Sequence, residues 1–455
     1  MKSIFLLLLC SCFFVSCSTP ENSKPNVVII FLDDAGWGDF RPFAKTSYPT
    51  PHVESLAKSG TRFNQFYVPQ AVCSASRSVL LSGCYPGRTK VFGAHGPNGR
   101  GLEPKFATIA EMLKGNGYAT AHFGKWHCGD QEATRPLARG FDKHAGLMYS
   151  NDMWRFHPTN PKHWGKFPLQ FWDNGKVTIK DVSKNDQKYL TKWATENSVN
   201  FIKENKDKPF FVYMAHSMPH VPLFCSPEFE GKSGAGLYGD VIMEIDWSVG
   251  QIEKAIEEAG VADNTMIIFS SDNGPWVVYG ERAGKTPYRE AKGTSFDGGI
   301  RSPLVIKYPG KIKAGVTSET AFCTVDILPT IAHLSGAKLP QNEIDGKNVW
   351  NLMTGESTKN PHVYYPFSNG RNFEGVISGD GKWKFHIPHG YRSVATYGKG
   401  GQSGTYKKGA KIGYALFDMK NDPFEKNNVI EKYPEVAAKM KALAEAHKAK
   451  FYTKK

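Results

Sequence analysis

The chain has 455 residues, of which 40% are hydrophobic, 22% charged and 13% aromatic, with 45 glycines and 28 prolines. These values exclude a disordered, collagen-like or coiled-coil protein, and the length suits two or three domains or one large domain with a smaller companion. The formal net charge of +14 favours an anionic partner. Because the sequence has no Lys/Arg-rich run and no nucleic-acid motif, we expect no nucleic-acid partner.

The first 20 residues have the pattern of an export signal. Lys2 is followed by an apolar run at residues 4–9 and then by small residues, and the stretch is too short for a comfortable membrane span. Cys17 lies in a context similar to the lipid-attachment site of bacterial lipoproteins, and Cys12 is a second candidate. We therefore predict a signal peptide at residues 1–17 and an exported bacterial protein, a periplasmic or cell-envelope lipoprotein whose lipid on Cys17 tethers it to a membrane. Ordinary cleavage with release into the periplasm is the alternative.

Apolar runs then alternate with stretches of helical spacing. Residues 26–32 form a near-continuous apolar run, which is typical of a strand buried on both faces. Similar runs predict strands at 118–123, 209–215, 265–271 and 303–308, and helical spacing predicts helices at 107–114, 186–203 and 240–259. This order predicts an α/β fold in which helices sandwich a large, mainly parallel sheet.

The pattern of predicted elements changes near residue 345. Short strands are expected at 375–378, 382–386 and 414–419, and a Lys/Ala/Glu-rich helix at 433–450 closes the chain. We predict a catalytic domain at 25–345 and a smaller C-terminal α+β subdomain at 346–455 with a small antiparallel sheet. Residues 397–413, rich in Gly, Lys and Tyr, are expected to form a mobile loop.

Four of the predicted strands are followed by polar clusters. These clusters are Asp33-Asp34, residues 124–127, residues 216–220 and Asp272-Asn273. Open α/β sheets bind ligands beyond the carboxyl ends of their strands, so one shared site is the economical expectation.

The acidic members of these clusters predict a metal site. Asp33 and Asp34 are adjacent acids at the end of a buried strand, which is unfavourable unless a cation or hydrogen bonds compensate them. For this pair alone, a solvated turn or a helix cap is the alternative. Asp272 and Asn273 add two oxygen ligands, and an all-oxygen site suits Ca²⁺ or Mg²⁺ rather than zinc.

Residues 72–83 predict a loop leading into a helix whose first turn holds Cys73 and Arg77. A helix N-terminus stabilises anions, and Arg77 adds a cation one turn on. A buried structural thiol beside a surface arginine is the alternative. Five of the eight cysteines lie beyond residue 20, and because an odd number cannot all pair internally, at least one should be free or chemically altered.

Four ordered motifs resemble those of the type I sulfatases, members of the alkaline phosphatase superfamily. Residues 73–77, Cys-Ser-Ala-Ser-Arg, are similar to the signature Cys-x-Pro/Ala-x-Arg, although Ala75 replaces the more frequent Pro and Cys84 stands where an Arg commonly follows. The other matches are residues 117–127, residues 292–294 with 298–303, and residues 416–418 with 422–425. The resemblance covers residues 25–428 and implies an alkaline-phosphatase-like fold and a sulfuric ester hydrolase.

The resemblance also implies roles for individual residues. Cys73 would be converted to formylglycine by a formylglycine-generating or anaerobic sulfatase-maturating enzyme. The implied metal ligands are Asp33, Asp34, Asp272, Asn273 and the modified Cys73, around Ca²⁺ rather than Mg²⁺. Arg77 would hold the aldehyde hydrate, Lys125 and Lys292 the sulfate oxygens, and His127 the formylglycine hydroxyls. His220 would protonate the leaving alcohol, with His216 as its nearest competitor, and Ser150 lies near the position of another active-site serine.

Sulfated carbohydrate chains are the expected substrate. Residues 149–172 carry aromatic and cationic side chains suited to a charged sugar, although such aromatics are more often part of a core. Candidates in the C-terminal part are Arg371, His386, His389 and Arg392. The alternatives are a phosphodiesterase or phosphonate monoester hydrolase of the same superfamily, and a non-catalytic, Ca²⁺-dependent glycan-binding relative.

Overall fold

The computed structural model describes residues 24–453. The predicted signal peptide and the candidate lipidation sites Cys17 and Cys12 lie outside the described residues. No helix within residues 24–453 is long and apolar enough to cross a membrane.

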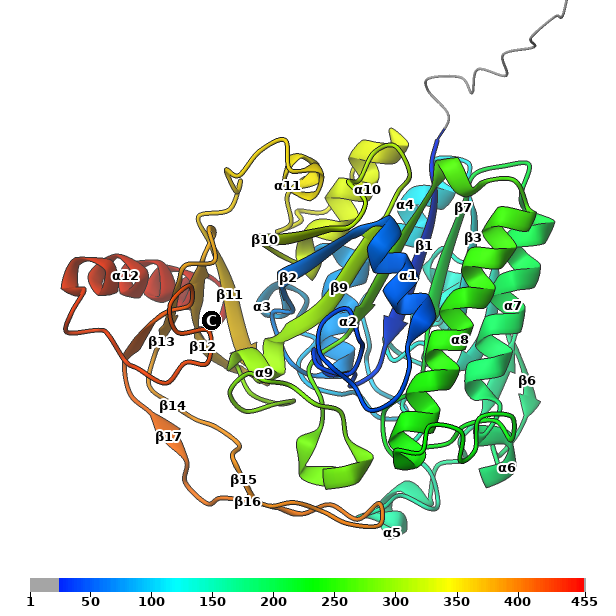
Figure 1. The fold of residues 1–455 in the computed structure, drawn as a ribbon, viewed down its shortest axis with the longest axis horizontal. Coiled ribbons are helices and arrows are strands. Elements are labelled where there is room, and N and C mark those ends of the chain that lie inside the picture. Colours follow the sequence, from blue (N-terminus) through cyan, green and yellow to red (C-terminus); the bar gives the residue numbers. More distant parts are fainter. Residues whose placement is uncertain (1–23, 454–455) are drawn as a thin grey trace, which may run out of the picture.

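A ten-stranded sheet forms the centre of the molecule (Figure 1). Its strands, in spatial order, are β10 (Val316–Cys323), β2 (Thr61–Tyr67), β9 (Arg301–Lys307), β8 (Thr265–Ser271), β1 (Asn26–Leu32), β7 (Phe210–Ala215), β3 (Ala119–Lys125), β4 (Lys143–Leu147), β5 (Phe171–Asp173) and β6 (Lys176–Ile179). The five strands from β8 to β4 are parallel to one another, whereas β9 runs antiparallel to both of its neighbours. The predicted α/β fold with a large, mainly parallel sheet is therefore confirmed.

Helices cover both faces of this sheet because β1 is apolar on both sides. Val27, Ile29 and Phe31 pack into a core cluster with α2 (Cys73–Ser82), α4 (Ile109–Lys114) and α10 (Ile327–Ser335). The alternate residues Val28 and Ile30 pack against α1 (Pro51–Ser59), α7 (Leu190–Glu204) and α8 (Gly236–Glu258). Alternation along a strand sends neighbouring side chains to opposite faces, so one continuous apolar run supports two cores.

Several elements differ from their predicted form. The single helix expected at 186–203 is two helices, α6 (Lys184–Gln187) and α7, and the helix expected at 240–259 begins earlier, at Gly236. The strand expected at 303–308 is β9, two residues longer at its start. The remaining short helices are α3 (Pro86–Thr89), α5 (Pro161–Trp164), α9 (Asp297–Ile300) and α11 (Trp350–Thr354).

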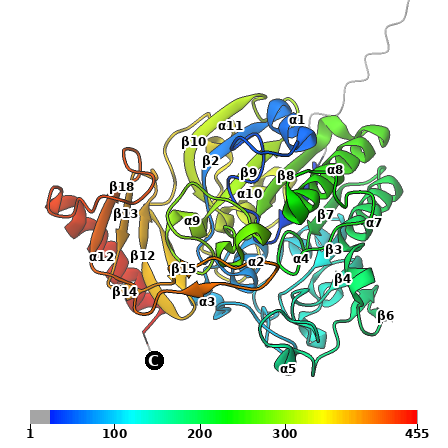
Figure 2. The same cartoon turned by 60° about the horizontal axis from the view of Figure 1, so that its bottom comes forward.

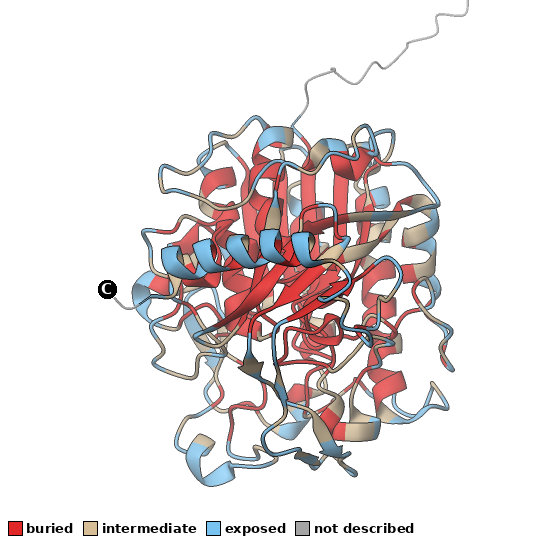
Figure 3. Ribbon diagram, turned by 90° about the vertical axis from the view of Figure 1, so that its left-hand side faces the viewer, coloured by how far each residue is buried: buried red, intermediate tan, exposed pale blue. Residues whose placement is uncertain are grey.

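A second, four-stranded antiparallel sheet follows in the chain. It consists of β11 (Tyr364–Asn369), β12 (Asn372–Ser378), β13 (Trp383–His386) and β18 (Ala415–Asp418), with α12 (Pro434–Phe451) packed against it. The predicted smaller antiparallel sheet with a terminal helix is thus present. Figure 3 shows that the strands are largely buried, whereas α12 carries exposed residues on its outer side.

The segment expected to be a mobile loop instead contains short paired strands. β15 (Val394–Thr396) pairs with β16 (Thr405–Tyr406), and β14 (His389–Gly390) pairs with β17 (Lys411–Ile412). The β15–β16 hairpin extends from the small sheet back toward the part of the chain that holds the large sheet (Figures 1 and 2). Its tip is anchored there, because the amides of Gly398 and Gly404 both donate to the carbonyl oxygen of Val278.

Candidate active site

The polar clusters that follow the central strands meet at one edge of the large sheet. Asp33 and Asp34 follow β1, Lys125 is the last residue of β3, and Asp272 and Asn273 follow β8. The cluster after β7 contributes His220, and Lys292 comes from the loop before α9. The expectation of one shared site is consistent with this arrangement, since contacts link residues from all of these segments.

Helix α2 presents its N-terminus to the same place. It begins at Cys73, its N-cap residue Val72 makes no side-chain cap, and it ends at Gly83, whose left-handed backbone lets its amide donate to Val79. Every residue of α2 is buried. The start of α2 has no side-chain cap, and Ala75 N donates to the carbonyl oxygen of Gly93. A helix start without a side-chain cap favours a bound anion beside residue 73.

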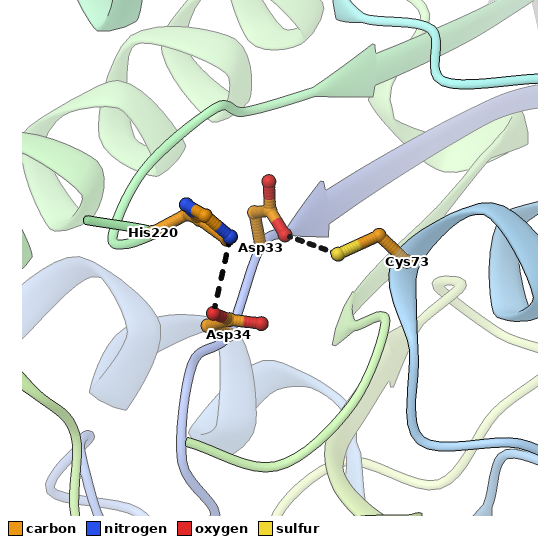
Figure 4. A group of neighbouring side chains, drawn as sticks. All are labelled: Asp33, Asp34, Cys73 and His220. Carbon is orange, nitrogen blue, oxygen red and sulfur yellow. Dashed lines mark hydrogen bonds and ion pairs between the residues drawn. The ribbon is translucent and has the colours of Figure 1, made fainter. Parts of the chain in front are cut away.

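A compact group of donors lies at the end of β1. Asp33, Asp34, Cys73 and His220 each offer one ligand atom, and these atoms all lie within 4.8 Å of one another (Figure 4). Burial, and then the charge of Asp33, raise the pKa of Asp272 to about 7. Neighbouring buried carboxylates resist ionisation in this way unless a cation lies between them.

The side chain of Asn273 gives a second indication of a cation. Its Nδ2 donates to Asp34 Oδ1 at 2.7 Å, whereas its Oδ1 is buried and has no hydrogen-bond partner among the described residues. A buried acceptor without a donor is costly, and a divalent cation would satisfy it. Carboxylate and amide oxygens together suit Ca²⁺ or Mg²⁺, so the residues present fit the predicted metal.

Three buried cations accompany the carboxylates. Lys125 Nζ donates to Asp33 and, at 3.1 Å, to Ser150 Oγ. Lys292 Nζ lies 2.7 Å from Asp34 and 3.5 Å from Cys73 Sγ.

Arg77 completes this set through a contact of 2.9 Å with Asp272 Oδ2. Burial would raise the pKa of Asp33, but the charges of Lys125, His220 and Arg77 outweigh it and hold that pKa well below its ordinary value. The ion pairs make a dense cationic wall around residue 73, which is suited to holding sulfate oxygens.

Two histidines have defined tautomers because each ring contacts a carbonyl oxygen, which can only accept. His127 Nε2 donates to His95 O at 2.7 Å, which leaves Nδ1 unprotonated, buried and without a partner in the described chain. His220 Nδ1 donates to Val221 O at 2.5 Å, and its Nε2 lies 3.6 Å from Asp34. Burial lowers the pKa of both rings.

His216, the competitor of His220, lies elsewhere. Its Nε2 is 3.1 Å from the hydroxyl of Ser248 on α8, and it does not line the cavity described next. Burial lowers its pKa to about 4. His216 is therefore a buried polar residue between β7 and α8, and His220 is the histidine that faces the site.

A cavity of about 430 Å³ opens onto this cluster. The predicted site residues that line it are Cys73, His127, Ser150, His220 and Lys292. Of the residues expected to contact sugar, His157, Trp164 and Arg392 also line it. Trp154 belongs to a core cluster and His386 is fully buried, so neither is available to a ligand.

Some residues of the site were not predicted. Asp152 lines the cavity and lies 3.4 Å from His157, and Trp276 stacks over Lys292 with its ring centre 4.4 Å from Nζ. His95 contributes through its backbone carbonyl, which no sequence pattern reveals. Asp152 lies inside the aromatic segment 149–172, where its acidic side chain was the available signal.

The five cysteines of the described chain are all unpaired and buried. Burial, followed by the charge of Asp33, raises the pKa of Cys73 well above its ordinary value. An unmodified Cys73 is therefore a poor nucleophile in this position.

Comparison with known proteins gives consistent matches over nearly the whole chain. A family model described as Sulfatase matches residues 25–337. Arylsulfatase A of Homo sapiens is 34% identical over 430 residues, which cover 89% of this chain and 83% of that protein.

Two bacterial proteins are similar over a larger share. N-acetylgalactosamine-6-O-sulfatase of Bacteroides thetaiotaomicron is 29% identical over 94% of both chains. The crystal structure of the sulfatase PsFucS1 from Pseudoalteromonas sp. superposes with a TM-score of 0.83 at 25% identity, over 95% of this chain and 92% of that one. The residues matched by the family model contain the large sheet and every residue of the cluster around Cys73.

Proposed function

The chain belongs to the sulfatase family, and we propose from this premise that it hydrolyses sulfate esters of carbohydrates by means of a formylglycine made from Cys73. The observation that carries the proposal is the position of Cys73 at the buried start of α2, in contact with Asp33 and Lys292. The matched relatives act as sulfuric ester hydrolases by name, and the three cations around residue 73 fit a sulfate group.

The residues of the proposed metal site are Asp33, Asp34, Asp272 and Asn273, together with the modified residue 73. Ca²⁺ suits these oxygen donors, with Mg²⁺ as the second choice. When bound, the cation would stabilise negative charge on the sulfate oxygens.

Residue 73 and the two histidines divide the chemistry between them. Formylglycine, once hydrated, supplies the hydroxyl oxygen that attacks sulfur. The proton of that hydroxyl passes to the carboxylate of Asp33, which lies 3.3 Å from the Sγ of Cys73.

The S–O bond to the sugar then breaks. His220 takes part as the imidazolium, with Nδ1–H on Val221 O, and the Nε2–H beside Asp34 gives its proton to the departing alcohol oxygen. Burial and Lys292 lower the pKa of His220, whereas the charges of Asp34 and Asp33 favour this protonated form. His127 Nδ1 is positioned to accept the proton of the second hydroxyl, which is the step that releases sulfate and restores the aldehyde.

The cationic residues act on the sulfate group throughout these steps. Lys292 lines the cavity, and Lys125 reaches it beside Ser150. Arg77, held by Asp272, would orient the hydrated aldehyde. Because these groups are fixed by buried ion pairs before the substrate arrives, little reorganisation is needed during the reaction.

The substrate class rests on the lining of the cavity and on the relatives. Trp164 offers an aromatic face, and Arg392 and His157 offer polar contacts, beside the sulfate-binding end. Two of the relatives are named for N-acetylgalactosamine 6-sulfate and for arylsulfate esters. We propose a sulfated saccharide as the natural substrate.

Export with a lipid on Cys17 is also part of the proposal, on the pattern of the first 20 residues. Cys17→Ser is expected to move the protein from the membrane fraction to the soluble fraction of its host. Equal fractionation of variant and native protein would leave ordinary cleavage as the better explanation.

Two measurements test the proposed function: whether Cys73 is converted to formylglycine, and whether the converted protein hydrolyses a sulfate ester. Protein made together with a maturation enzyme is expected to show formylglycine at residue 73 by peptide mass spectrometry and to hydrolyse 4-nitrophenyl sulfate. Cys73→Ala should lower kcat at least a thousandfold, whereas Cys225→Ala, which removes a buried thiol that does not line the cavity, should keep it within a few fold.

Two results would overturn this function. Faster turnover of bis(4-nitrophenyl) phosphate than of the sulfate would make the chain a phosphodiesterase. If Cys73 stays an unmodified thiol in a host that converts a control sulfatase, a non-catalytic, Ca²⁺-dependent glycan-binding protein becomes the better explanation.

A further inference from the structure

A second cavity, of about 520 Å³, adjoins the catalytic one. Its lining includes Thr89, Lys90, Ala94, His95, Arg100 and Arg371. It comes from the loop after α3 and from the turn between β11 and β12, so it is formed where the large and small sheets face each other.

The two cavities share part of their lining. Ala94 lines both of them, and Gly370 lines the catalytic cavity while its neighbour Arg371 lines the second. Gly96 of the second cavity lies against Trp164 of the first, and a side chain at Gly96 would come within 3.2 Å of that ring. The two cavities therefore adjoin, so that one extended ligand can have groups in both.

Positive charge dominates the second cavity. Glu103 is its one acidic lining residue, and it already pairs with Arg100 and with Lys105. Lys90 donates to the carbonyl oxygen of Phe451 at 2.8 Å, and neither it nor Arg371 forms an ion pair within residues 24–453. Arg371 lies over the ring of Phe92 at 5.3 Å, which steadies its guanidinium without neutralising it.

The two unpaired cations act on each other. The pKa of Lys90 is lowered first by burial and then by the charge of Arg371. Like charges held this close are unfavourable, and an anion between them would remove the repulsion. The catalytic cluster differs, because each of its cations already has a carboxylate partner.

We propose that this second cavity is a subsite for another anionic group of the substrate, a sulfate ester or a carboxylate on a sugar next to the one that is desulfated. The inference rests on the proposed function and makes the substrate a multiply charged oligosaccharide. Arg371 offers a planar pair of donors for two oxygens of one group, and Lys90 adds a point charge.

Inhibition of 4-nitrophenyl sulfate hydrolysis tests the subsite, because this small ester reaches only the catalytic cavity. The inhibitors are inorganic sulfate, a carrageenan tetrasaccharide that carries sulfates without carboxylates, and a chondroitin 6-sulfate tetrasaccharide that carries both. The variants are Arg371→Gln and Lys90→Gln, with the exposed residues Arg41→Gln and Lys382→Gln as matched controls outside this cavity.

Arg371→Gln is expected to weaken inhibition by at least one tetrasaccharide about tenfold, and Lys90→Gln severalfold, with no change for inorganic sulfate or for kcat/KM of the aryl ester. If the variants are inhibited less by both tetrasaccharides, the subsite binds sulfate. If they are inhibited less by the chondroitin tetrasaccharide alone, the subsite binds carboxylate. Unchanged inhibition in both variants, or losses equal to those of the controls, overturns the subsite.

Failure of the proposed function is a separate result. The proposed function fails if protein whose residue 73 is formylglycine does not hydrolyse aryl sulfate. In that case calorimetric titration of the same two tetrasaccharides into wild type and Arg371→Gln decides the subsite, with equal affinities counting against it.

Discussion

At the scale of single residues, the site is a set of buried charges that satisfy one another imperfectly. Asp33 and Asp34 each have a lysine partner, and Asp272 has Arg77. The Oδ1 of Asn273 nevertheless has no partner, and the pKa of Asp272 stays raised to about 7 by burial and then by Asp33. The two lysines and Arg77 match the three carboxylates in charge, but none of them donates to Asn273 Oδ1.

Removal of the divalent cation is expected to destabilise the folded protein. At a hundredfold excess over its dissociation constant, a ligand that binds only the folded state adds about 2.7 kcal/mol of stability. For a chain of this size we expect chelation to lower Tm by roughly 3 °C. Differential scanning calorimetry with EGTA, and with Ca²⁺ or Mg²⁺ restored, measures this shift.

Asp272→Asn provides the control, since it removes one proposed ligand. Its Tm should respond little to chelator. If EGTA leaves the Tm of the wild-type protein unchanged, the proposed metal site is contradicted.

Glu244 on α8 gives the protein a pH-dependent stability unrelated to the reaction. Its Oε2 accepts from the amide of Ser226 at 3.1 Å, its Oε1 is buried without a partner, and burial raises its pKa from 4.5 to about 7. The folded state therefore binds the proton more tightly than the unfolded state. The stability that this proton contributes is present below pH 4.5 and is lost as pH rises to 7.

Glu244→Gln should remove this dependence. Between pH 4.5 and 8, its free energy of unfolding should gain up to roughly 3 kcal/mol relative to wild type. Urea denaturation at both pH values measures the change, and any constant packing cost of the substitution cancels in the comparison. A difference that does not vary with pH would show that Glu244 titrates normally in the folded protein.

Sequence alone identified the residues whose chemistry is carried by side chains in recognisable motifs. Cys73, Arg77, Lys125 and Lys292 fall into this group, and the structure brings them together. His95 was not predicted because it acts through its main-chain carbonyl. Asp152 was not predicted because a single acidic residue in a loop, with no second acid or ligand beside it, forms no motif. The roles assigned to the site residues and the identity of the ion remain predictions.

At the scale of elements, the predicted strands match the observed ones best where the apolar run in the sequence is continuous. The strands β1 and β8 were predicted with their observed bounds because their apolar runs are continuous. The strands β2, β4 and β10 were missed. β2 has polar residues between its apolar ones, β4 is short and contains His and Gly, and β10 is an edge strand with an exposed first half.

Gly124 makes the close packing of β3 possible just before Lys125. Its φ is +107°, and a Cβ there would lie 2.0 Å from the carbonyl oxygen of Ala215 on β7. Gly124→Ala should therefore cost roughly 3 kcal/mol or more and displace Lys125, so that kcat falls as well. Denaturation and aryl sulfate turnover measure the two effects.

Gly117→Ala is the matched control for this substitution. Gly117 also has a positive φ, +85°, but a Cβ there meets nothing within 4 Å. It should cost only about 1–2 kcal/mol and leave activity intact. Equal costs at the two glycines would mean that backbone strain, and not the approach of β7, governs both positions.

At the scale of the whole molecule, the two sheets share buried contacts. Phe367 and Ile377 of the small sheet pack in one cluster with Tyr67 of β2, with Val68 directly after it, and with Ile300 of α9. The division into domains at residues 345 and 346 remains a prediction. These shared contacts lead us to expect that the sheets unfold together.

Lys384 links the two parts through buried ion pairs. Its fully buried amine lies 2.8 Å from Asp297 and 2.7 Å from Glu425. Lys384→Met would remove the lysine from the buried carboxylate of Glu425 and leave Asp297 with Arg301 alone, at 3.3 Å, and should cost about 3–5 kcal/mol. Thermal or urea unfolding measures this loss.

The control is Lys382→Met, two residues earlier and exposed, which should change stability by no more than about 0.5 kcal/mol. Two separate unfolding transitions in Lys384→Met, with the first sheet unaffected, would contradict the coupling. A loss equal to that of Lys382→Met would show that the buried ion pairs contribute nothing.

The β15–β16 hairpin has a consequence for how relatives of this protein diverge. It leaves the small sheet, returns to Val278 and Trp276, and brings Arg392 to the cavity, yet it supplies none of the residues around Cys73. Mutation or insertion between residues 389 and 412 can therefore reshape the entrance without touching the chemistry below it. A lineage could inherit the sulfate-cleaving centre unchanged and acquire a new sugar by exchanging this one hairpin.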